Sequence, residues 1–516
     1  MRTASLCVAA LLALGPGLAA ALQLSAEEAA GKRIFLEGVS ASGGEIHARV
    51  GAAGTTLPAS ALPCGSCHGA DGRGRPEGGV RPPDITWRRL STPYGQALNG
   101  RVYPAYDEAS LARAIVEGRD PAGNRLDPAM PRFVLSPRDL RDLAAYLRRL
   151  EDDRDPGLAS DRLGLGTLLP TSGPLAGLGR TVEAMLRGGL AQINDAGGIH
   201  GRRLELRVVD SGGDAASAEA ALRQLLDDDQ VFALVAPLAP ALDGRFGALL
   251  EGSRVPLLGP LSPYGAGESS PLVFEVLPGL REQLLALGRF ASRDLDPAAG
   301  EALILFPRDA GVAALAERLA ERLRAQGWAR VRRQDYAGVP GAPAGPPPSA
   351  LFFLGGETDF AALAQDLQRA GQHPYLLAVS TQVAGSALRL PAEFSGRLFL
   401  AYPFVPGDWS AEGVAALTQV RTQAGLDEQH MLLQIGAFSA VQLLGEGLRQ
   451  AGRDVSRERL VKALEGLHGF RTGLTPPLEF GPGQRVGAAG AHIVGVDIAA
   501  RRFRPVGDYI RLQRDW

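Results

Sequence analysis

The sequence predicts a small all-α domain followed by a larger α/β domain with two lobes. Residues 23–150 contain few strand signals and several short helical patterns, whereas residues 162–516 alternate short apolar strands with amphipathic helices. Between them, residues 151–161 are charged and contain Pro156 and Gly157, so we expect a linker there. The total of 516 residues also exceeds the size of one ordinary domain.

Residues 1–21 have the pattern of a signal peptide. A positive start precedes an apolar run from Ala4 to Leu14, and Ala19-Ala20-Ala21 offers small residues for cleavage. The alternative, an uncleaved anchor, is disfavoured because the apolar core is too short to span a bilayer comfortably. We therefore expect an exported, periplasmic protein whose mature chain has no transmembrane segment.

The overall charge balance excludes one class of partner. The formal net charge is −2, with 45% hydrophobic and 21% charged residues, which is typical of a globular chain. Because there is no global basic field, we expect no nucleic acid partner.

Residues 64–68, Cys-Gly-Ser-Cys-His, predict covalent attachment of one haem c. Cys64 and Cys67 can form thioethers to the two vinyl groups of a haem, and the adjacent His68 can then ligate the iron. Two alternatives are weaker. A thiol–disulfide motif needs a thioredoxin-like strand before it, and a zinc site needs two more soft ligands than this domain contains.

The sixth iron ligand follows by elimination. Met130 is the one methionine of residues 23–150 and lies between Pro128 and Pro131, in a rigid loop suited to holding a thioether near iron. The alternative is a plain core methionine, and His47 is the rival ligand. Ligation by histidine and methionine raises the reduction potential relative to two histidines, which suits accepting electrons from a dehydrogenase.

Two helices are expected to close the haem crevice. The first covers Ala26 to Leu36, and the second begins at a capping box made by Ser136 and Asp139. The carbonyl group of Pro82 or Pro83 is a candidate for orienting the His68 ring, with a plain turn proline as the equal alternative.

Together these features resemble the class I cytochrome c family over about residues 26–150. The matching stretches include CGSCH at 64–68, RPPDIT at 81–86 and AMPRF at 129–133. The resemblance implies that His68 and Met130 are the axial ligands of the haem iron. The insertion between Glu37 and Pro63 is longer than in the compact family pattern, and we expect it to form a loop at the haem edge.

The remaining sequence predicts two Rossmann-like lobes with a cleft between them. Short apolar strands at 164–169, 204–209 and 231–235 alternate with helices, and a second set begins near 302–306. Ligands in such open sheets bind beyond the carboxyl ends of the strands. The sequence has no nucleotide-binding glycine motif, no nucleophile elbow and no metal-ligand cluster, so we assign no catalytic residue.

This region resembles the type I periplasmic binding proteins, specifically the branched-chain amino-acid receptors, over about residues 162–511. LPTSGPLAGLGR at 169–180 and INDAGGIHGR at 193–202 carry the resemblance. It implies a hinged, two-lobed binder of a small molecule. Ser172, Ser262 and Tyr264 are the candidate ligand contacts, with ordinary loop residues as the alternative.

Two departures from that family bear on the ligand. Receptors for amino acids bind the ligand carboxylate in the loop after the strand at 231–235, but residues 236–240 read Ala-Pro-Leu-Ala-Pro here, and proline has no N–H to donate. The Pro-rich tract 338–348 also replaces a helix. Two alternatives to amino-acid binding then remain: a more apolar ligand, or a loss of ligand binding.

The sequence therefore predicts a periplasmic electron carrier rather than an enzyme. Its partner would be a periplasmic dehydrogenase or terminal oxidase, and its α/β domain would dock or sense. The alternative is a substrate-binding receptor that delivers its ligand to an ABC permease, with an accessory haem domain that senses redox state. An oxidoreductase with its own substrate site lacks catalytic residues.

Overall fold

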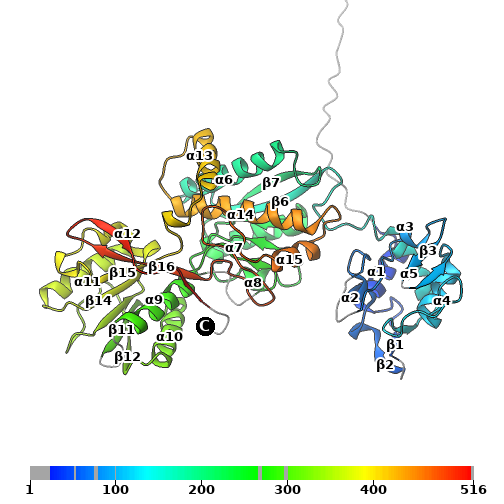
Figure 1. Cartoon of the computed structure of the whole chain (residues 1–516), viewed down its shortest axis with the longest axis horizontal. Coiled ribbons are helices and arrows are strands. Elements are labelled where there is room, and N and C mark those ends of the chain that lie inside the picture. Colours follow the sequence, from blue (N-terminus) through cyan, green and yellow to red (C-terminus); the bar gives the residue numbers. More distant parts are fainter. Residues whose placement is uncertain are drawn as a thin grey trace, which may run out of the picture. The chain divides into compact units, whose positions relative to one another are not determined.

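The computed structural model describes residues 24–51, 54–74, 80–98, 100–264, 270–295 and 300–512. The predicted signal peptide, residues 1–21, lies outside the described residues. The chain divides into two compact units, Met1–Ala159 and Ser160–Trp516. Figure 1 shows the first unit in blue to cyan and the second in cyan to red.

The first unit contains helices and strands. Its helices are α1 (Ala26–Glu37), α2 (Cys64–His68), α3 (Trp87–Leu90), α4 (Glu108–Glu117) and α5 (Pro137–Arg149). Its strands are β1 (His47–Val50), β2 (Thr55–Pro58), β3 (Gln96–Leu98), β4 (Arg101–Tyr103) and β5 (Arg132–Val134). A three-stranded antiparallel sheet has the order β2-β1-β5, and β3 pairs with β4.

The expectation of an all-α domain was therefore wrong. The insertion between Glu37 and Pro63, expected as a loop, folds into the β1–β2 hairpin and pairs with β5. Each of these strands has only three or four residues, which is too short for an alternating apolar pattern to stand out.

The two predicted closing helices are confirmed. Both α1 and α5 begin with a capping box, from Ser25 to Glu28 and from Ser136 to Asp139. They pack closely, because a Cβ on Gly31 of α1 would lie 1.9 Å from the Asp142 carbonyl oxygen of α5. A glycine is therefore required where the helices cross, and this crossing closes one side of the unit.

The second unit has two sheets joined by crossing segments. The first sheet, in the order β10-β9-β8-β6-β7, is parallel throughout. Its elements are β6 (Arg162–Leu169), α6 (Ala176–Asp195), β7 (Arg203–Asp210), α7 (Ala215–Arg223), β8 (Ala233–Val235), α8 (Phe246–Leu249), β9 (Leu257–Leu258) and β10 (Val273–Phe274). Three later helices return to this lobe: α13 (Ala411–Ala424), α14 (Met431–Ala451) and α15 (Arg457–Glu465).

The second sheet has the order β12-β11-β13-β14-β15-β16-β17, with β18 beside β16. Strands β11 to β15 are parallel, and the strands after β15 run antiparallel to their neighbours. Its elements are α9 (Leu280–Asp294), β11 (Glu301–Pro307), α10 (Ala310–Ala325), β12 (Arg330–Tyr336), β13 (Ala350–Phe353), α11 (Glu357–Arg369), β14 (Tyr375–Val379), α12 (Ser380–Ala387), β15 (Leu398–Tyr402), β16 (Gly490–Asp497), β17 (Arg502–Pro505) and β18 (Ile510–Arg511).

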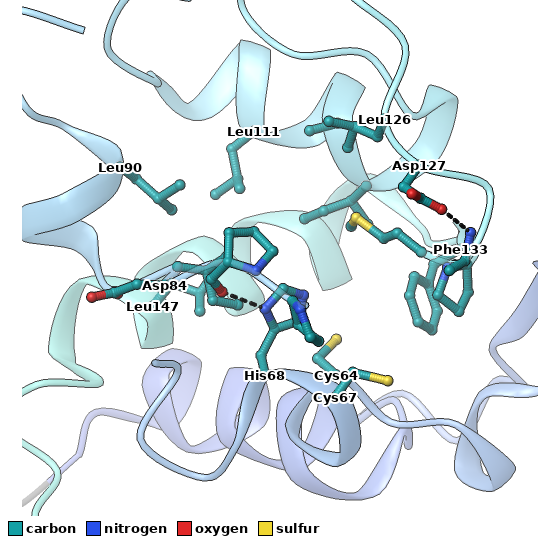
Figure 2. Close-up of a pocket in the computed structure, with 18 of the residues that line it drawn as sticks. Cys64, Cys67, His68, Asp84, Leu90, Leu111, Leu126, Asp127, Phe133 and Leu147 are labelled. Carbon is teal, nitrogen blue, oxygen red and sulfur yellow. Dashed lines mark hydrogen bonds between the residues drawn. The ribbon is translucent and has the colours of Figure 1, made fainter. Parts of the chain in front are cut away.

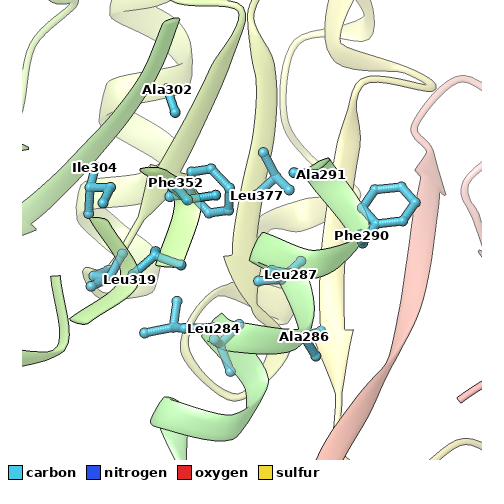
Figure 3. Close-up of a cluster of buried hydrophobic side chains, with 14 of the residues drawn as sticks. Leu284, Ala286, Leu287, Phe290, Ala291, Ala302, Ile304, Leu319, Phe352 and Leu377 are labelled. Carbon is cyan, nitrogen blue, oxygen red and sulfur yellow. The ribbon is translucent and has the colours of Figure 1, made fainter. Parts of the chain in front are cut away.

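Apolar side chains fix helices to this second sheet. Figure 3 shows Leu284 and Leu287 of α9 beside Phe352 and Leu377 of the sheet, and all four are at most 2% exposed. The Pro-rich tract 338–348 contains no helix or strand, as predicted, and the Ala342 N–H donates to the Asp366 carboxylate at 2.6 Å.

The segments that cross between the two sheets also pair with one another. The Glu275 N–H donates to the Arg485 carbonyl at 2.8 Å, and the Gly487 N–H donates to the Glu275 carbonyl at 2.8 Å. A third crossing is joined to β16 where His492 Nε2 lies 3.0 Å from the Asp408 carboxylate. Hydrogen bonds thus tie the connections between the lobes together.

One helix among the described residues, α14, is long and apolar enough to cross a membrane by length and composition. The sequence prediction overlooked this stretch. Within the second unit, 72% of its most apolar window is buried, which is the environment of a core helix.

Candidate functional site

The structure brings Cys64, Cys67, His68 and Met130 to one cavity of about 400 Å³ in the first unit. Helix α2 places the two cysteines three residues apart, so that they lie on one face of the helix, with His68 directly after them. Most of the wall is apolar, formed by Phe35, Leu62, Leu90, Leu111, Ala114, Ile115, Leu126, Phe133, Leu143 and Leu147. In Figure 2, His68 and the cysteines lie at one wall, and Leu111 and Leu126 lie across from them.

A backbone carbonyl group orients the His68 ring. Nδ1 of His68 lies 3.0 Å from the carbonyl oxygen of Pro83, which confirms the second of the two proline candidates (Figure 2). A carbonyl oxygen only accepts, so Nδ1 carries the proton and Nε2 keeps its lone pair. Burial lowers the pKa of His68, against the opposing effects of the Pro83 hydrogen bond and the Asp84 charge. The ring is therefore a neutral imidazole, the form that binds a metal.

The two alternatives for the cysteine motif find little support in the site. Burial raises the pKa of the Cys64 thiol to about 12, which disfavours the thiolate form of that cysteine. Within the residues that the structure describes, no group of three or more His, Cys, Asp or Glu side chains could hold a zinc ion. Two thiols, one neutral imidazole and one thioether around an apolar cavity fit a haem c.

Met130 lies in a tight turn at the edge of the cavity. The Ala129 N–H donates to the Asp127 carboxylate at 2.8 Å, and the Met130 N–H donates to the Asp127 carbonyl at 3.1 Å. The rival ligand His47 is on β1, is 44% exposed, and lies 3.8 Å from the Glu45 carboxylate. It does not line the cavity. The geometry thus favours Met130 over His47.

Sequence reasoning missed a buried ion pair at the cavity. Arg101 of β4 lines the cavity and donates from Nη1 to the Asp120 carboxylate at 2.8 Å, and the Asp120 side chain is 0% exposed. Asp120 also accepts from the N–H groups of Ala122 at 3.1 Å and Asn124 at 2.9 Å. A fixed cation in this wall suits an anionic group such as a haem propionate.

The candidate ligand contacts of the second unit fall into two groups. Ser172 follows β6 and donates to the Asp210 carboxylate, at the end of β7, at 2.7 Å. Ser262 hydrogen-bonds to Asp243. Burial raises the pKa of Asp243 to about 6, although the hydrogen bond from Ser262 acts to lower it. Burial also raises the pKa of Tyr264, and the carboxylates of Asp309 and Asp243 add to this effect. Ser262 and Tyr264 therefore share the surroundings of Asp243, and Ser172 does not belong to that group.

The loop after β8 uses its own donors internally. The Ala236 N–H donates to the Leu258 carbonyl at 2.9 Å, and the Leu238 N–H donates to the Leu168 carbonyl at 2.8 Å. Pro237 and Pro240 have no N–H at all. Of residues 236–240, only Ala239 keeps an N–H that is not already used in these two bonds, so this loop offers little to a ligand carboxylate.

The cavity of the first unit and the two sheets of the second unit together define the class of protein. A Cys-x-x-Cys-His cavity with apolar walls is the site of a cytochrome, and two mainly parallel sheets joined by crossing segments form a two-lobed binding protein. Residues 163–499 match the family described as Periplasmic binding protein, and residues 52–151 match Cytochrome c. The chain belongs to the periplasmic binding protein family, and it carries a cytochrome c domain, which implies a haem c cofactor. Both families are typically periplasmic and exported.

Similar proteins agree with this assignment. A chemotactic signal transduction system substrate-binding protein, BasB of Halobacterium salinarum, is 29% identical over 212 residues, which cover 38% of this chain. The match spans 51% of that relative, about half of its length.

Two solved structures are similar in fold. A branched-chain amino acid ABC transporter protein from Thermus thermophilus with bound valine has a TM-score of 0.54 at 16% identity, over 69% of this chain and 98% of its own. A fatty acid ABC transporter substrate-binding protein from Thermomonospora curvata has a TM-score of 0.54 at 16% identity, over 70% and 95%. At this identity the likeness shows the fold alone.

The buried pair at the cavity gives a first prediction. Arg101→Gln should lower the free energy of unfolding of the first unit by about 3 kcal/mol, because it leaves the buried Asp120 charge without its cation. Adding Asp120→Asn should recover part of that loss. Denaturant titration of the whole protein, followed by haem absorbance, measures both effects.

Arg33→Gln is the matched control, because Arg33 is 51% exposed and pairs with the exposed Glu37 at 3.6 Å. It should change the same free energy by at most about 0.5 kcal/mol. If the double variant is less stable than Arg101→Gln alone, the unpaired charge is not the cause of the loss.

Proposed function

We propose that this chain is a periplasmic electron-transfer protein that carries one covalent haem c. Cys64 and Cys67 would hold the haem through thioether bonds, each thiol adding its sulfur to one vinyl carbon and its hydrogen to the other. His68 and Met130 would supply the imidazole and thioether ligands of the iron. When bound, the haem accepts and releases one electron as its iron changes between the ferric and ferrous states.

The residues of the cavity support this function because they fix the proton of His68 and the position of the Arg101 cation. The Pro83 carbonyl keeps the His68 proton on Nδ1, so Nε2 is available to the metal. The apolar wall excludes water, and a neutral imidazole and thioether add no charge to the site. Arg101 supplies the cation for a propionate, held in place by the buried Asp120. This combination is that of a carrier rather than of a catalyst.

The electron must pass to or from another protein, which we propose is a periplasmic dehydrogenase or a terminal oxidase. The β3–β4 hairpin supports an approach close to the cavity. Arg101 lines the cavity, whereas its neighbour Val102 is 74% exposed and Tyr94 before the hairpin is 96% exposed.

Export requires the signal peptide at residues 1–21 to be recognised and cleaved.

We propose that the second unit binds a small molecule between Rossmann-like lobes that close about the crossing segments. Its family and the names of its relatives support a ligand, and they support an ABC permease or a chemotaxis component as its partner. This is the second candidate function, a substrate-binding receptor with a redox-sensing haem domain. The loop at 236–240 favours a ligand without an amino-acid carboxylate over valine or leucine.

The iron ligand is tested by Met130→Ala. The oxidised protein should show the weak long-wavelength absorption band of methionine–iron ligation, and the variant should lose it and have a lower reduction potential. Met431→Ala, at the start of α14 in the other unit, is the control and should keep both properties. A band that survives in Met130→Ala would contradict the assignment, and so would a native protein without the band.

The ligand is tested by thermal unfolding of the whole protein with free amino acids. Valine and leucine should leave the melting temperature of the second unit unchanged, because the loop after β8 has almost no free donors. A ligand at a hundred times its Kd would stabilise the unit by about 2.7 kcal/mol, which is easily detected. A saturable rise of the melting temperature with either amino acid would contradict the proposal that this loop does not bind an amino-acid carboxylate.

A further inference from the structure

The loop that carries Met130 is held from two sides by parts of the first unit with no other evident task. We propose that Arg132, supported by the β1–β2 hairpin, is a positioning residue that keeps the Met130 thioether at the haem iron. This inference rests on the proposed ligation by Met130.

Arg132 hydrogen-bonds to three carbonyl groups of a single loop. Its Nη1 donates to the Met130 carbonyl, and its Nη2 donates to the carbonyls of Leu126 at 3.1 Å and Asp127 at 3.3 Å. The planar guanidinium has several donors in a fixed fork, so one side chain can join both ends of the turn. The backbone from Leu126 to Met130 is thereby closed around one charged group.

Hydrogen bonds within the loop leave some of its carbonyl groups without a donor from the loop itself. Pro128 and Pro131 remove two N–H groups from it, and the N–H groups of Ala129 and Met130 both donate to Asp127. Its carbonyls at 126, 127 and 130 are the groups that Arg132 satisfies. Without Arg132, the carbonyls of Leu126 and Met130 would lose these hydrogen bonds, and the loop would be held less firmly.

The Arg132 guanidinium packs against Gly118, where a side chain would collide with it. A Cβ on Gly118, the residue that ends α4, would lie 1.8 Å from Arg132 Nε and 2.1 Å from Cζ. Gly118 has a φ of 69°, and its carbonyl accepts from the Leu126 N–H at 2.8 Å. The end of α4 thus supports both the arginine and the start of the Met130 loop.

The β1–β2 hairpin supports the chain on the other side of Met130, where β5 begins. In the register of β1 and β5, Arg49 pairs with Arg132 and Ala48 pairs with Phe133. Phe133 lines the haem cavity and is 6% exposed, and Ala48 is 0% exposed. Pairing with β1 therefore sets the direction in which the chain leaves Met130, while the Arg132 side chain folds back onto the loop before it.

A thioether needs such support more than an imidazole does. Sulfur in methionine is a neutral and weak ligand, so its occupancy of the iron depends on how well the protein holds it in place against competing ligands. His68 is buried and hydrogen-bonded, whereas Met130 is partly exposed. The loop that carries Met130 is then the side of the site at which an outside ligand enters.

The test is imidazole binding to the oxidised whole protein, because imidazole must displace Met130 from the iron. Arg132→Gln should bind imidazole roughly tenfold more tightly than the native protein, as expected for the loss of charged hydrogen bonds from a partly exposed group. Arg132→Lys keeps the charge but not the fork, and should fall between them. Arg33→Gln is again the control, because Arg33 is 51% exposed and lies 3.6 Å from Glu37, which is itself 57% exposed.

The outcomes separate the two proposals. If the native protein lacks the methionine–iron band, the ligation fails and the positioning role fails with it. If that band is present and Arg132→Gln and Arg132→Lys bind imidazole like the native protein, the ligation stands and the positioning role is overturned. Far-ultraviolet circular dichroism checks folding, and the lysine variant decides the matter if the glutamine variant does not fold.

Discussion

The hydrogen bond from His68 Nδ1 to the Pro83 carbonyl is the constraint on which the first unit depends. It settles which ring nitrogen is free and how the buried ring is oriented, and it joins the end of α2 to the segment that contains Pro83. The two cysteines precede His68 on the same short helix, so their position follows from that of the ring. The opposite wall must then present its ligand to a fixed point, and the β1–β2 hairpin, Gly118 and Arg132 all converge on that wall.

The two units place different demands on their loops. Around Met130, carbonyl groups are satisfied by a charged side chain, which keeps the loop in one shape. In the loop after β8, N–H groups are used by neighbouring strands, which leaves little for a ligand. The first arrangement suits a redox centre that changes little when it gains an electron. The second leaves a binding-protein fold in which this loop contributes little to holding a ligand carboxylate.

Features set by adjacent residues could be predicted from the sequence, and features set by distant pairs could not. The Cys-x-x-Cys-His motif, the capping box at Ser136 and the order of strands and helices in the second unit are local patterns. The sequence could not choose between Pro82 and Pro83, because the choice depends on how a loop meets the ring. It also missed the pairing of β1 with β5, and with it the role of Arg132, since those strands are short and far apart in the chain.

Covalent attachment of one haem through both cysteines is the central claim, and peptide mapping of the denatured protein tests it most directly. We expect acid–acetone treatment to leave the haem on the chain, the peptide containing residues 64–68 to carry the mass of one haem, and neither Cys64 nor Cys67 to react with iodoacetamide. Haem that is extracted by the solvent, or alkylation of both cysteines in the haem-loaded protein, would contradict it.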